Sequence, residues 1–153
     1  MPREIAIARA VPGDAAIMQA IHASCFTRGW DITAMTRFLS APDTAYLLGT
    51  LLDGANSTPG GMLIARRAAD ESELLTLAVA PVCRRAGLGR ALLVNAIDLL
   101  GSAGARQLFL EVDEGNQAAV ALYASLGAVR VGKRPSYYDD GADAAIFSLA
   151  LSQ

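Results

Sequence analysis

The sequence contains one histidine and two cysteines among its 153 residues. Cys25 and Cys83 lie far apart, and neither has a companion cysteine or histidine cluster. Metal centres and disulfide frameworks need such residues at short, regular spacing, so the sequence predicts no metal site and no disulfide-stabilised fold. Two unclustered cysteines are also typical of a reducing compartment, which favours a cytoplasmic location.

Long apolar runs are also lacking. The richest leucine segment is interrupted by Asn95 and Asp98, whereas a membrane span needs about 20 consecutive apolar residues. Residues 1–4 lead directly into an alternating pattern without the apolar core of a signal peptide, so we expect neither secretion nor a membrane partner. The formal net charge of -2 and a pI of about 5.3 give no basis for nucleic-acid binding.

Hydrophobic residues make up 53 % of the chain and charged residues 18 %, which excludes a disordered protein. The length is that of one ordinary domain, and the chain has no internal repeat or linker. We therefore expect a single domain over residues 1–153, of the α/β (α+β) class, with a mixed sheet of about seven strands and about four flanking helices. The expected strands cover residues 4–9, 46–52, 61–68, 74–80, 107–112, 129–133 and 144–151, and the expected helices follow Pro12, Asp31, Gly87 and Asn116.

The first expected helix contains the histidine. Ile17, Ile21 and Cys25 recur at four-residue spacing, which predicts one buried face with His22 beside it. The sequence places no serine, aspartate or second ligand to work with His22. We therefore interpret it as a packed or solvent-facing side chain rather than a catalytic one.

Two further segments of the first half connect expected elements. The loop from Phe26 to Trp30 carries two aromatic residues, and Trp30 either lines a substrate mouth or anchors the core. Residues 53–60 combine glycine, asparagine, serine and proline, which predicts a turn between two antiparallel strands.

The segment after the strand at 74–80 combines two glycines with three arginines and opens an apolar run with helical spacing. Glycines let the backbone turn tightly and approach a ligand, and the first turn of a helix leaves four N–H donors without helical partners. Together with the helix dipole, such donors favour a phosphate. Residues 84–90 are therefore predicted to bind a pyrophosphate, and the structural alternative is an ordinary glycine-rich turn.

Three classes of phosphate loop can be compared with this segment. A triphosphate P-loop ends in Gly-Lys-Ser/Thr, whereas Gly89 is followed here by Arg90 and Ala91. A dinucleotide fingerprint has a third glycine where this chain has Leu92. The remaining pattern, Arg-x-x-Gly-x-Gly between a strand and a helix, resembles the acyl-CoA loop of the GNAT superfamily of N-acetyltransferases.

A second motif narrows this resemblance. Its residues, in the spacing found here, are Glu111, Asn116, Leu122, Tyr123, Leu126 and Gly127. They resemble the bacterial ribosomal-protein alanine N-acetyltransferase branch of the superfamily, and the similarity extends to Trp30 and to Tyr137-Tyr138. The chain departs from the branch at Ala128, where an aromatic residue is usual.

Amide formation from a thioester requires a neutral amine, a polarised carbonyl and a proton for the leaving thiolate. An α-amine has a pKa of about 7.7–8.0 and needs only a modest base. Glu111, near the end of a central strand, is the candidate general base, and Tyr123 is the candidate general acid because a phenol can protonate a nearby thiolate. The resemblance implies the same roles. The structural alternatives are a carboxylate paired with an arginine and a tyrosine that packs its ring.

The resemblance also implies that acetyl-CoA is the co-substrate and that no metal takes part. Backbone groups near Val79 would bind the pantetheine arm and polarise the acetyl carbonyl. Asn116 would contact the cofactor, and its alternative role is that of a helix cap. The cofactor-binding residues implied in this way are Leu77, Ala78, Val79, Arg84, Arg85, Ala86, Gly87, Leu88, Gly89, Arg90 and Asn116.

The function implied by the resemblance is acetylation of the N-terminal α-amine of a protein, such as alanine in a small-subunit ribosomal protein. Two alternatives stay open: transfer to a small-molecule amine or a lysine side chain, and a non-catalytic sensor of acyl-CoA. A covalent mechanism through Cys83 is disfavoured because the sequence provides no histidine to activate the thiol. The sequence does not predict the oligomeric state.

Overall fold

The computed structural model describes residues 4–26, 30–137 and 141–152. Within these residues, one seven-stranded sheet has the order β1-β2-β3-β4-β5-β7-β6, and four α-helices flank it, which confirms the predicted fold. No helix in this part of the chain has the length and apolar character needed to cross a membrane. The strands are β1 Glu4–Arg9, β2 Thr44–Asp53, β3 Asn56–Ala68, β4 Glu71–Val79, β5 Gln107–Asp113, β6 Val129–Arg134 and β7 Ala144–Ala150. The α-helices are α1 Ala15–Ala23, α2 Ile32–Ser40, α3 Leu88–Ser102 and α4 Gln117–Ser125, and the 3-10 turns are η1 Pro12–Asp14 and η2 Pro81–Cys83.

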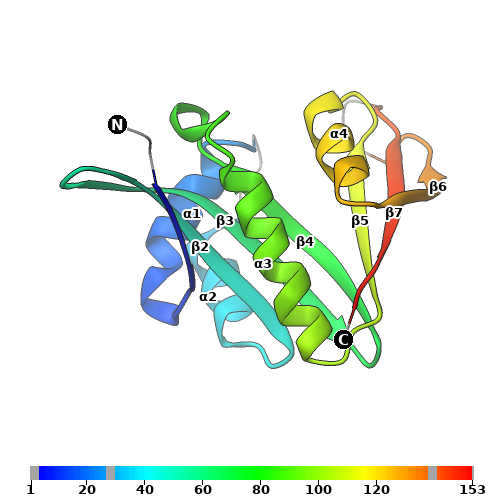
Figure 1. Ribbon diagram of the computed structural model, residues 1–153, viewed down its shortest axis with the longest axis horizontal. Coiled ribbons are helices and arrows are strands. Elements are labelled where there is room, and N and C mark those ends of the chain that lie inside the picture. Colours follow the sequence, from blue (N-terminus) through cyan, green and yellow to red (C-terminus); the bar gives the residue numbers. More distant parts are fainter. Residues whose placement is uncertain (1–3, 27–29, 138–140, 153) are drawn as a thin grey trace.

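The helices cover the sheet from both sides (Figure 1). On one face, α3 and α4 bury side chains such as Leu92 and Tyr123 in a large core cluster. On the other face, α1 and α2 bury Met18 and Met35 in a second cluster. Residues 62–65 of β3 contribute alternately to the two clusters because successive strand residues point to opposite faces.

The predicted buried face of α1 is wrong at Ile17, whose exposed fraction is 41 %. The helix buries Ile21, as predicted, together with Ala15, Met18 and His22. A helix has 3.6 residues per turn, so a row of residues spaced by four drifts around its surface, and only the alternation of three- and four-residue steps follows one face. Cys25 lies beyond the end of α1.

The predicted turn at residues 53–60 is also wrong, because most of it is strand. β2 and β3 pair as far as Asp53 and Asn56, and the hairpin extends past the neighbouring strands (Figure 1). Pro59 is tolerated there because β4 pairs with β3 only from Gly61 onward, so the missing N–H faces no partner strand. Gly60 is the extra residue of a bulge in this ladder.

The strands β4 and β5 are parallel, but they separate soon after they meet. Over the described residues, their pairing is confined to Glu71–Glu73 of β4. Immediately afterwards β4 contains a bulge, because Ile64 pairs with Thr76 while Ala65 pairs with Leu74. A bulge bends its strand and increases its twist, so it accounts for the divergence of β4 from β5.

Candidate active site

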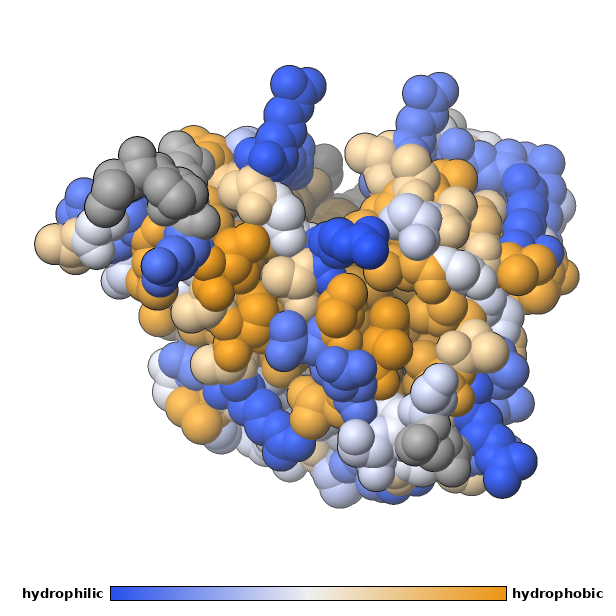
Figure 2. Space-filling model, viewed as in Figure 1, coloured by the Kyte–Doolittle hydropathy of each residue, from blue (hydrophilic) through white to orange (hydrophobic). Residues whose placement is uncertain are grey.

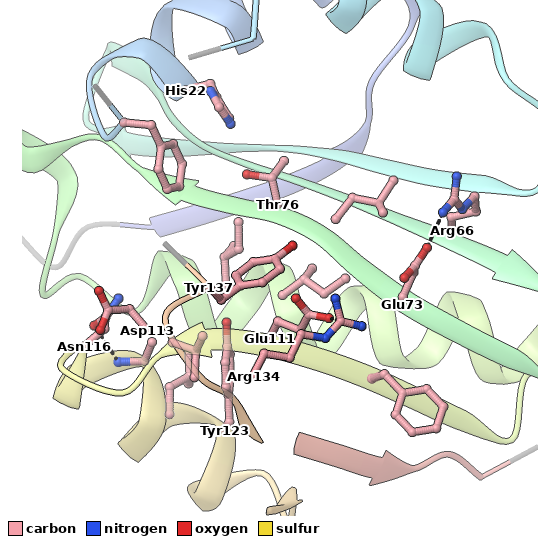
Figure 3. Close-up of a pocket in the computed structure, with 18 of the residues that line it drawn as sticks. His22, Arg66, Glu73, Thr76, Glu111, Asp113, Asn116, Tyr123, Arg134 and Tyr137 are labelled. Atoms are coloured by element: carbon pink, nitrogen blue, oxygen red, sulfur yellow. Dashed lines mark hydrogen bonds and ion pairs between the residues drawn. The ribbon is translucent and has the colours of Figure 1, made fainter. Parts of the chain in front are cut away.

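A cavity of about 830 Å³ lies between the diverging ends of β4 and β5 (Figure 3). Both strands contribute walls, and so do the end of α1, the start of α4 and the segment that follows β6. Three residues selected from the sequence for chemistry, Glu111, Asn116 and Tyr123, line this cavity together. Its other polar or ionisable lining residues are His22, Arg66, Glu73, Thr76, Asp113, Arg134 and Tyr137.

Glu111 reaches the cavity because of its register in β5. Leu110 and Val112 point into the core under α3 and α4, so Glu111 between them points to the opposite face. Its carboxylate is about one-third exposed and forms an ion pair with Arg134, with 3.2 Å between Oε1 and Nη2. The carboxylate therefore has an arginine partner and also borders the cavity.

Tyr123 enters the cavity from α4. The residue is 5 % exposed, and its ring packs edge-on against Phe147 with 6.1 Å between ring centroids. In Figure 3 the side chain extends from α4 toward Glu111 and Tyr137. The packed ring fixes the phenol in place while it lines the cavity, so the structural and chemical interpretations of this residue are compatible.

Both ends of α4 are fixed by local hydrogen bonds, and these set the position of Tyr123. At the start, the Ala119 N–H donates to Asn116 Oδ1 at 3.1 Å, which confirms the predicted cap. At the end, Gly127 has a φ of 95° and the Ala128 N–H donates to the Tyr123 carbonyl at 3.1 Å. A left-handed glycine is a common helix end, and Gly127 closes α4 in this way.

The three β4 residues implied as cofactor-binding lie in different surroundings. Leu77 lines the cavity, whereas Ala78 is buried in the cluster under α1 and α2. The Val79 carbonyl accepts hydrogen bonds from Arg84 Nε at 3.0 Å and from the Cys25 thiol at 3.2 Å. The end of β4 is therefore tied to the glycine loop on one side and to the end of α1 on the other.

The glycine loop lies at the end of β4. All of residues 84–90 are described, and none of them lines the cavity. The surface has a notch between the start of α3 and α4 (Figure 2). The backbone has positive φ angles of 65° at Arg85 and 85° at Gly87, where α3 begins. Arg90 reaches across to α4 and donates to Ser125 Oγ at 3.0 Å.

The close approach of α3 to the sheet depends on glycines in β3. A Cβ atom added at Gly61 would lie 2.8 Å from Leu92 Cδ1, and one at Gly60 would lie 2.4 Å from Cys83 Sγ. Larger residues would therefore push away the start of α3 and the loop before it. Cys83 itself is buried in the core, which removes it from contact with a substrate.

Near the end of α1, the cavity is lined by aromatic rings. His22 is buried, and its ring contacts those of Phe26 and Trp30, with ring centroids 4.5 Å and 5.0 Å away. The Trp30 backbone N–H donates to His22 Nδ1 at 3.3 Å, and burial lowers the pKa of the imidazole. His22 is therefore packed, as expected, but its ring also lines the cavity. Trp30 stacks on Phe38 and lines the cavity as well, so it serves both proposed roles.

The basic residues of β6 have carboxylate partners. Arg130 forms an ion pair with Glu114, and Lys133 Nζ lies 2.8 Å from Asp143. The hydrogen bond between Lys133 and Asp143 raises the pKa of the lysine and lowers the pKa of the carboxyl. The neighbouring carboxylates of Asp113 and Glu114 lie in different places: Asp113 lines the cavity, whereas Glu114 pairs with Arg130 of β6.

Sequence reasoning missed Arg134, Arg66 and Glu73 as cavity residues. Arg66 pairs with Glu73 across β3 and β4, and Arg134 pairs with Glu111 across β6 and β5. No short motif contains these pairs, because the partners come from different strands. Among the described residues, no three histidine, cysteine, aspartate or glutamate side chains form a group that could hold a metal ion.

The cavity has a carboxylate and a phenol, which are suited to proton transfer. The neighbouring helix α3 begins in a glycine- and arginine-rich loop, which is suited to a substrate that carries phosphates. Residues 15–128 match the Acetyltransferase (GNAT) family, and the chain belongs to this family.

Named relatives share the sequence over parts of their length. The chain is 46 % identical over 86 residues to the [ribosomal protein bS18]-alanine N-acetyltransferase of Escherichia coli K12, a match that covers 54 % of this chain and 58 % of that protein. It is 31 % identical over 134 residues, or 87 % of each chain, to a putative [ribosomal protein bS18]-alanine N-acetyltransferase of Bacillus subtilis. The crystal structure of the Escherichia coli ribosomal-protein-S18-alanine N-acetyltransferase aligns with a TM-score of 0.85 and 31 % identity, covering 98 % of this chain and 96 % of that one.

Proposed function

We propose that this chain transfers an acetyl group from acetyl-CoA to the α-amine of a protein N-terminus. The observation that carries the proposal is the convergence of Glu111 and Tyr123 on one cavity between β4 and β5. Family membership supports the acetyl donor. The names of the relatives support an N-terminal alanine, for example in a ribosomal protein, as the acceptor.

In the proposed mechanism Glu111 takes a proton from the acceptor ammonium, directly or through a water. Its second carboxylate oxygen, Oε2, is suited to this role because Arg134 engages Oε1. The modest basicity of a carboxylate matches an α-amine, whose pKa of about 7.7–8.0 leaves part of it neutral at physiological pH. A lysine amine, with a pKa near 10.4, would require a stronger base.

Tyr123 supplies a proton to the departing thiolate in this mechanism. Acetyl-CoA, when bound, provides a thioester that is already activated toward the amine, so direct transfer needs no acyl-enzyme. Tyr123 is suited to the acid role because Phe147 and the two capped ends of α4 hold its ring in one orientation. A proton donor must lie within hydrogen-bond reach of its target in the bound complex, and a fixed ring favours this.

The residues that would hold the cofactor are those of the glycine loop and the first turn of α3. The N–H groups of residues 88–90 open the helix, and the arginines of the loop add positive charge. Gly60 and Gly61 let this loop lie close to the sheet, which supports the fit of a pyrophosphate beside β4.

The test measures thiol release from acetyl-CoA with two peptides. One has a free N-terminal alanine and blocked lysines, and the other has a blocked N-terminus and free lysines. We expect turnover on the first peptide alone. Turnover on the second alone would make the chain a lysine acetyltransferase. Turnover on neither, with acetyl-CoA binding intact, would favour a small-molecule acceptor or a sensor of acyl-CoA.

A further inference from the structure

Glu111 and Arg134 pair although their strands are not neighbours. β7 lies between β5 and β6 in the sheet. Two strand spacings amount to about 9–10 Å, so only a long side chain can bridge them. Arginine is long enough, and its planar guanidinium matches a carboxylate better than a lysine ammonium does.

A small residue on β7 leaves the path open. Ala144 pairs with Arg134 on one side and with Asp113 on the other. Directly paired residues point to the same face of a sheet, and Glu111, two residues before Asp113, shares that face. Ala144 is fully buried, and the direct β7 partner of Glu111 is Ile146, so the Arg134 side chain must cross β7 diagonally, over the small Ala144, to reach Glu111.

The guanidinium and the chain beside it are held from further directions. The Arg134 Cζ atom lies 5.4 Å from the centre of the Tyr137 ring, which provides a cation–π contact. Asp143 contacts the chain on both sides of Arg134. Its Oδ1 accepts the Ser136 N–H at 2.7 Å, and its Oδ2 lies 2.8 Å from Lys133 Nζ. The position of Arg134 is therefore set by its strand, by its contact with the Tyr137 ring and by the contacts of Asp143 with the residues around it.

We infer that Arg134 is a positioning residue for the Glu111 carboxylate. It holds Oε1 and so presents Oε2 to the acceptor amine. This inference rests on the proposed function, in which Glu111 is the general base. The ordinary alternative is a half-exposed ion pair of little consequence, which is what most surface pairs are.

The chain contains a matched control for this alternative. Arg66 and Glu73 form another arginine–glutamate pair on the same cavity, with an exposed side-chain fraction of 53 % for each arginine. Glu73 has no part in the proposed chemistry. The two arginines are therefore equally exposed and both pairs border the cavity. The glutamates differ in exposure, 49 % for Glu73 and 32 % for Glu111, and only Glu111 is the proposed base.

The test is a double-mutant cycle of Arg134→Met and Glu111→Gln. Arg134→Lys and Arg66→Met are the comparison variants, and the measured quantity is the single-turnover rate of acetylation of the alanine peptide. We expect Arg134→Met to lower the rate about tenfold or more, since a small misplacement of a catalytic group has effects of that order. Acetyl-CoA affinity should stay unchanged. In the Glu111→Gln background the same substitution should change the rate by less than about twofold, because residues that act as a unit are not additive. Arg134→Lys should recover part of the loss.

Each other outcome has a definite meaning. Equal losses in both backgrounds, or equal losses in Arg134→Met and Arg66→Met, would overturn the inference and leave the proposed function intact. Wild-type rates in Arg134→Met, with Glu111→Gln inactive, would do the same. A fully active Glu111→Gln variant would instead remove the proposed base, and the inference would fall with it.

Discussion

The two sides of the cavity are built by different means. On the side of β4 and α3, position is set by the backbone: Gly60 and Gly61 admit the helix, and a left-handed Gly87 begins it. On the side of α1, β5 and β6, position is set by long side chains that meet across strands and helices. The Glu111–Arg134 pair and the stack of His22 on Trp30 are examples.

This difference has a physical basis. A cofactor with constant chemistry can be bound by N–H groups and glycine turns, whose geometry depends on a short stretch of chain. An acceptor amine must be met by a carboxylate in the right orientation, and orientation depends on contacts from several elements. Under the proposed function, the side of β4 and α3 is the cofactor side and the side of α1, β5 and β6 is the acceptor side. We therefore expect the cofactor side to respond to changes in backbone space, and the acceptor side to changes in single polar groups.

The largest effect is expected at Glu111 and Tyr123, the proposed general base and general acid. Glu111→Gln and Tyr123→Phe should each lower turnover by about 10²–10⁴-fold, the range contributed by a general acid or base. Acetyl-CoA binding, measured by calorimetry, should stay close to that of the unchanged chain, because neither substitution alters the glycine loop. Glu73→Gln, on the same cavity, is the matched control. Retained turnover in both variants, with normal cofactor binding, would show that neither side chain serves as the general base or the general acid.

A backbone substitution tests the cofactor side. Gly60→Ala should lower the free energy of unfolding by about 1–3 kcal/mol, because the added Cβ would lie 2.4 Å from Cys83 Sγ and the loop must shift. Denaturant unfolding measures the loss, and acetyl-CoA affinity should fall with it. Gly13→Ala is the control, since a Cβ there meets nothing within 4 Å. Equal stability of the two variants would show that close approach does not position the loop.

The same contrast explains how much could be predicted from the sequence. The glycine loop, the Asn116 cap and the Gly127 end of α4 are local features, and the structure has the Asn116 cap where the sequence predicts it. The Arg134–Glu111 pair requires the order β5-β7-β6, which no short motif encodes. The turn predicted at residues 53–60 failed for a related reason, because composition there favours a turn while pairing with β2 extends the strand.

The acceptor side should respond to pH through His22. Burial lowers its pKa in the folded chain, so below the unfolded value of about 6.5 protons bind the unfolded state preferentially. Burial of the neutral His22 therefore carries no protonation cost above pH 6.5, and the free energy of unfolding decreases as the pH falls below that value. His22 is the only histidine, so the free energy of unfolding should decrease from pH 7.5 to pH 5.5 in the unchanged chain and much less in His22→Gln. Equal slopes in the two proteins would show that burial of His22 has no energetic consequence.

The smallest effect is expected at the thiol beside the glycine loop. Cys83→Ala should change turnover by no more than about a factor of two, since a group with no contact in the transition state leaves kcat unchanged. Cys83 is 2 % exposed and packs under Gly60, where it serves the shape of the cofactor side rather than its chemistry. Cys25→Ala is the matched comparison, because that thiol hydrogen-bonds the Val79 carbonyl at the end of β4. A large loss of turnover in Cys83→Ala with an unchanged unfolding midpoint would mean that the reaction passes through an acyl-enzyme.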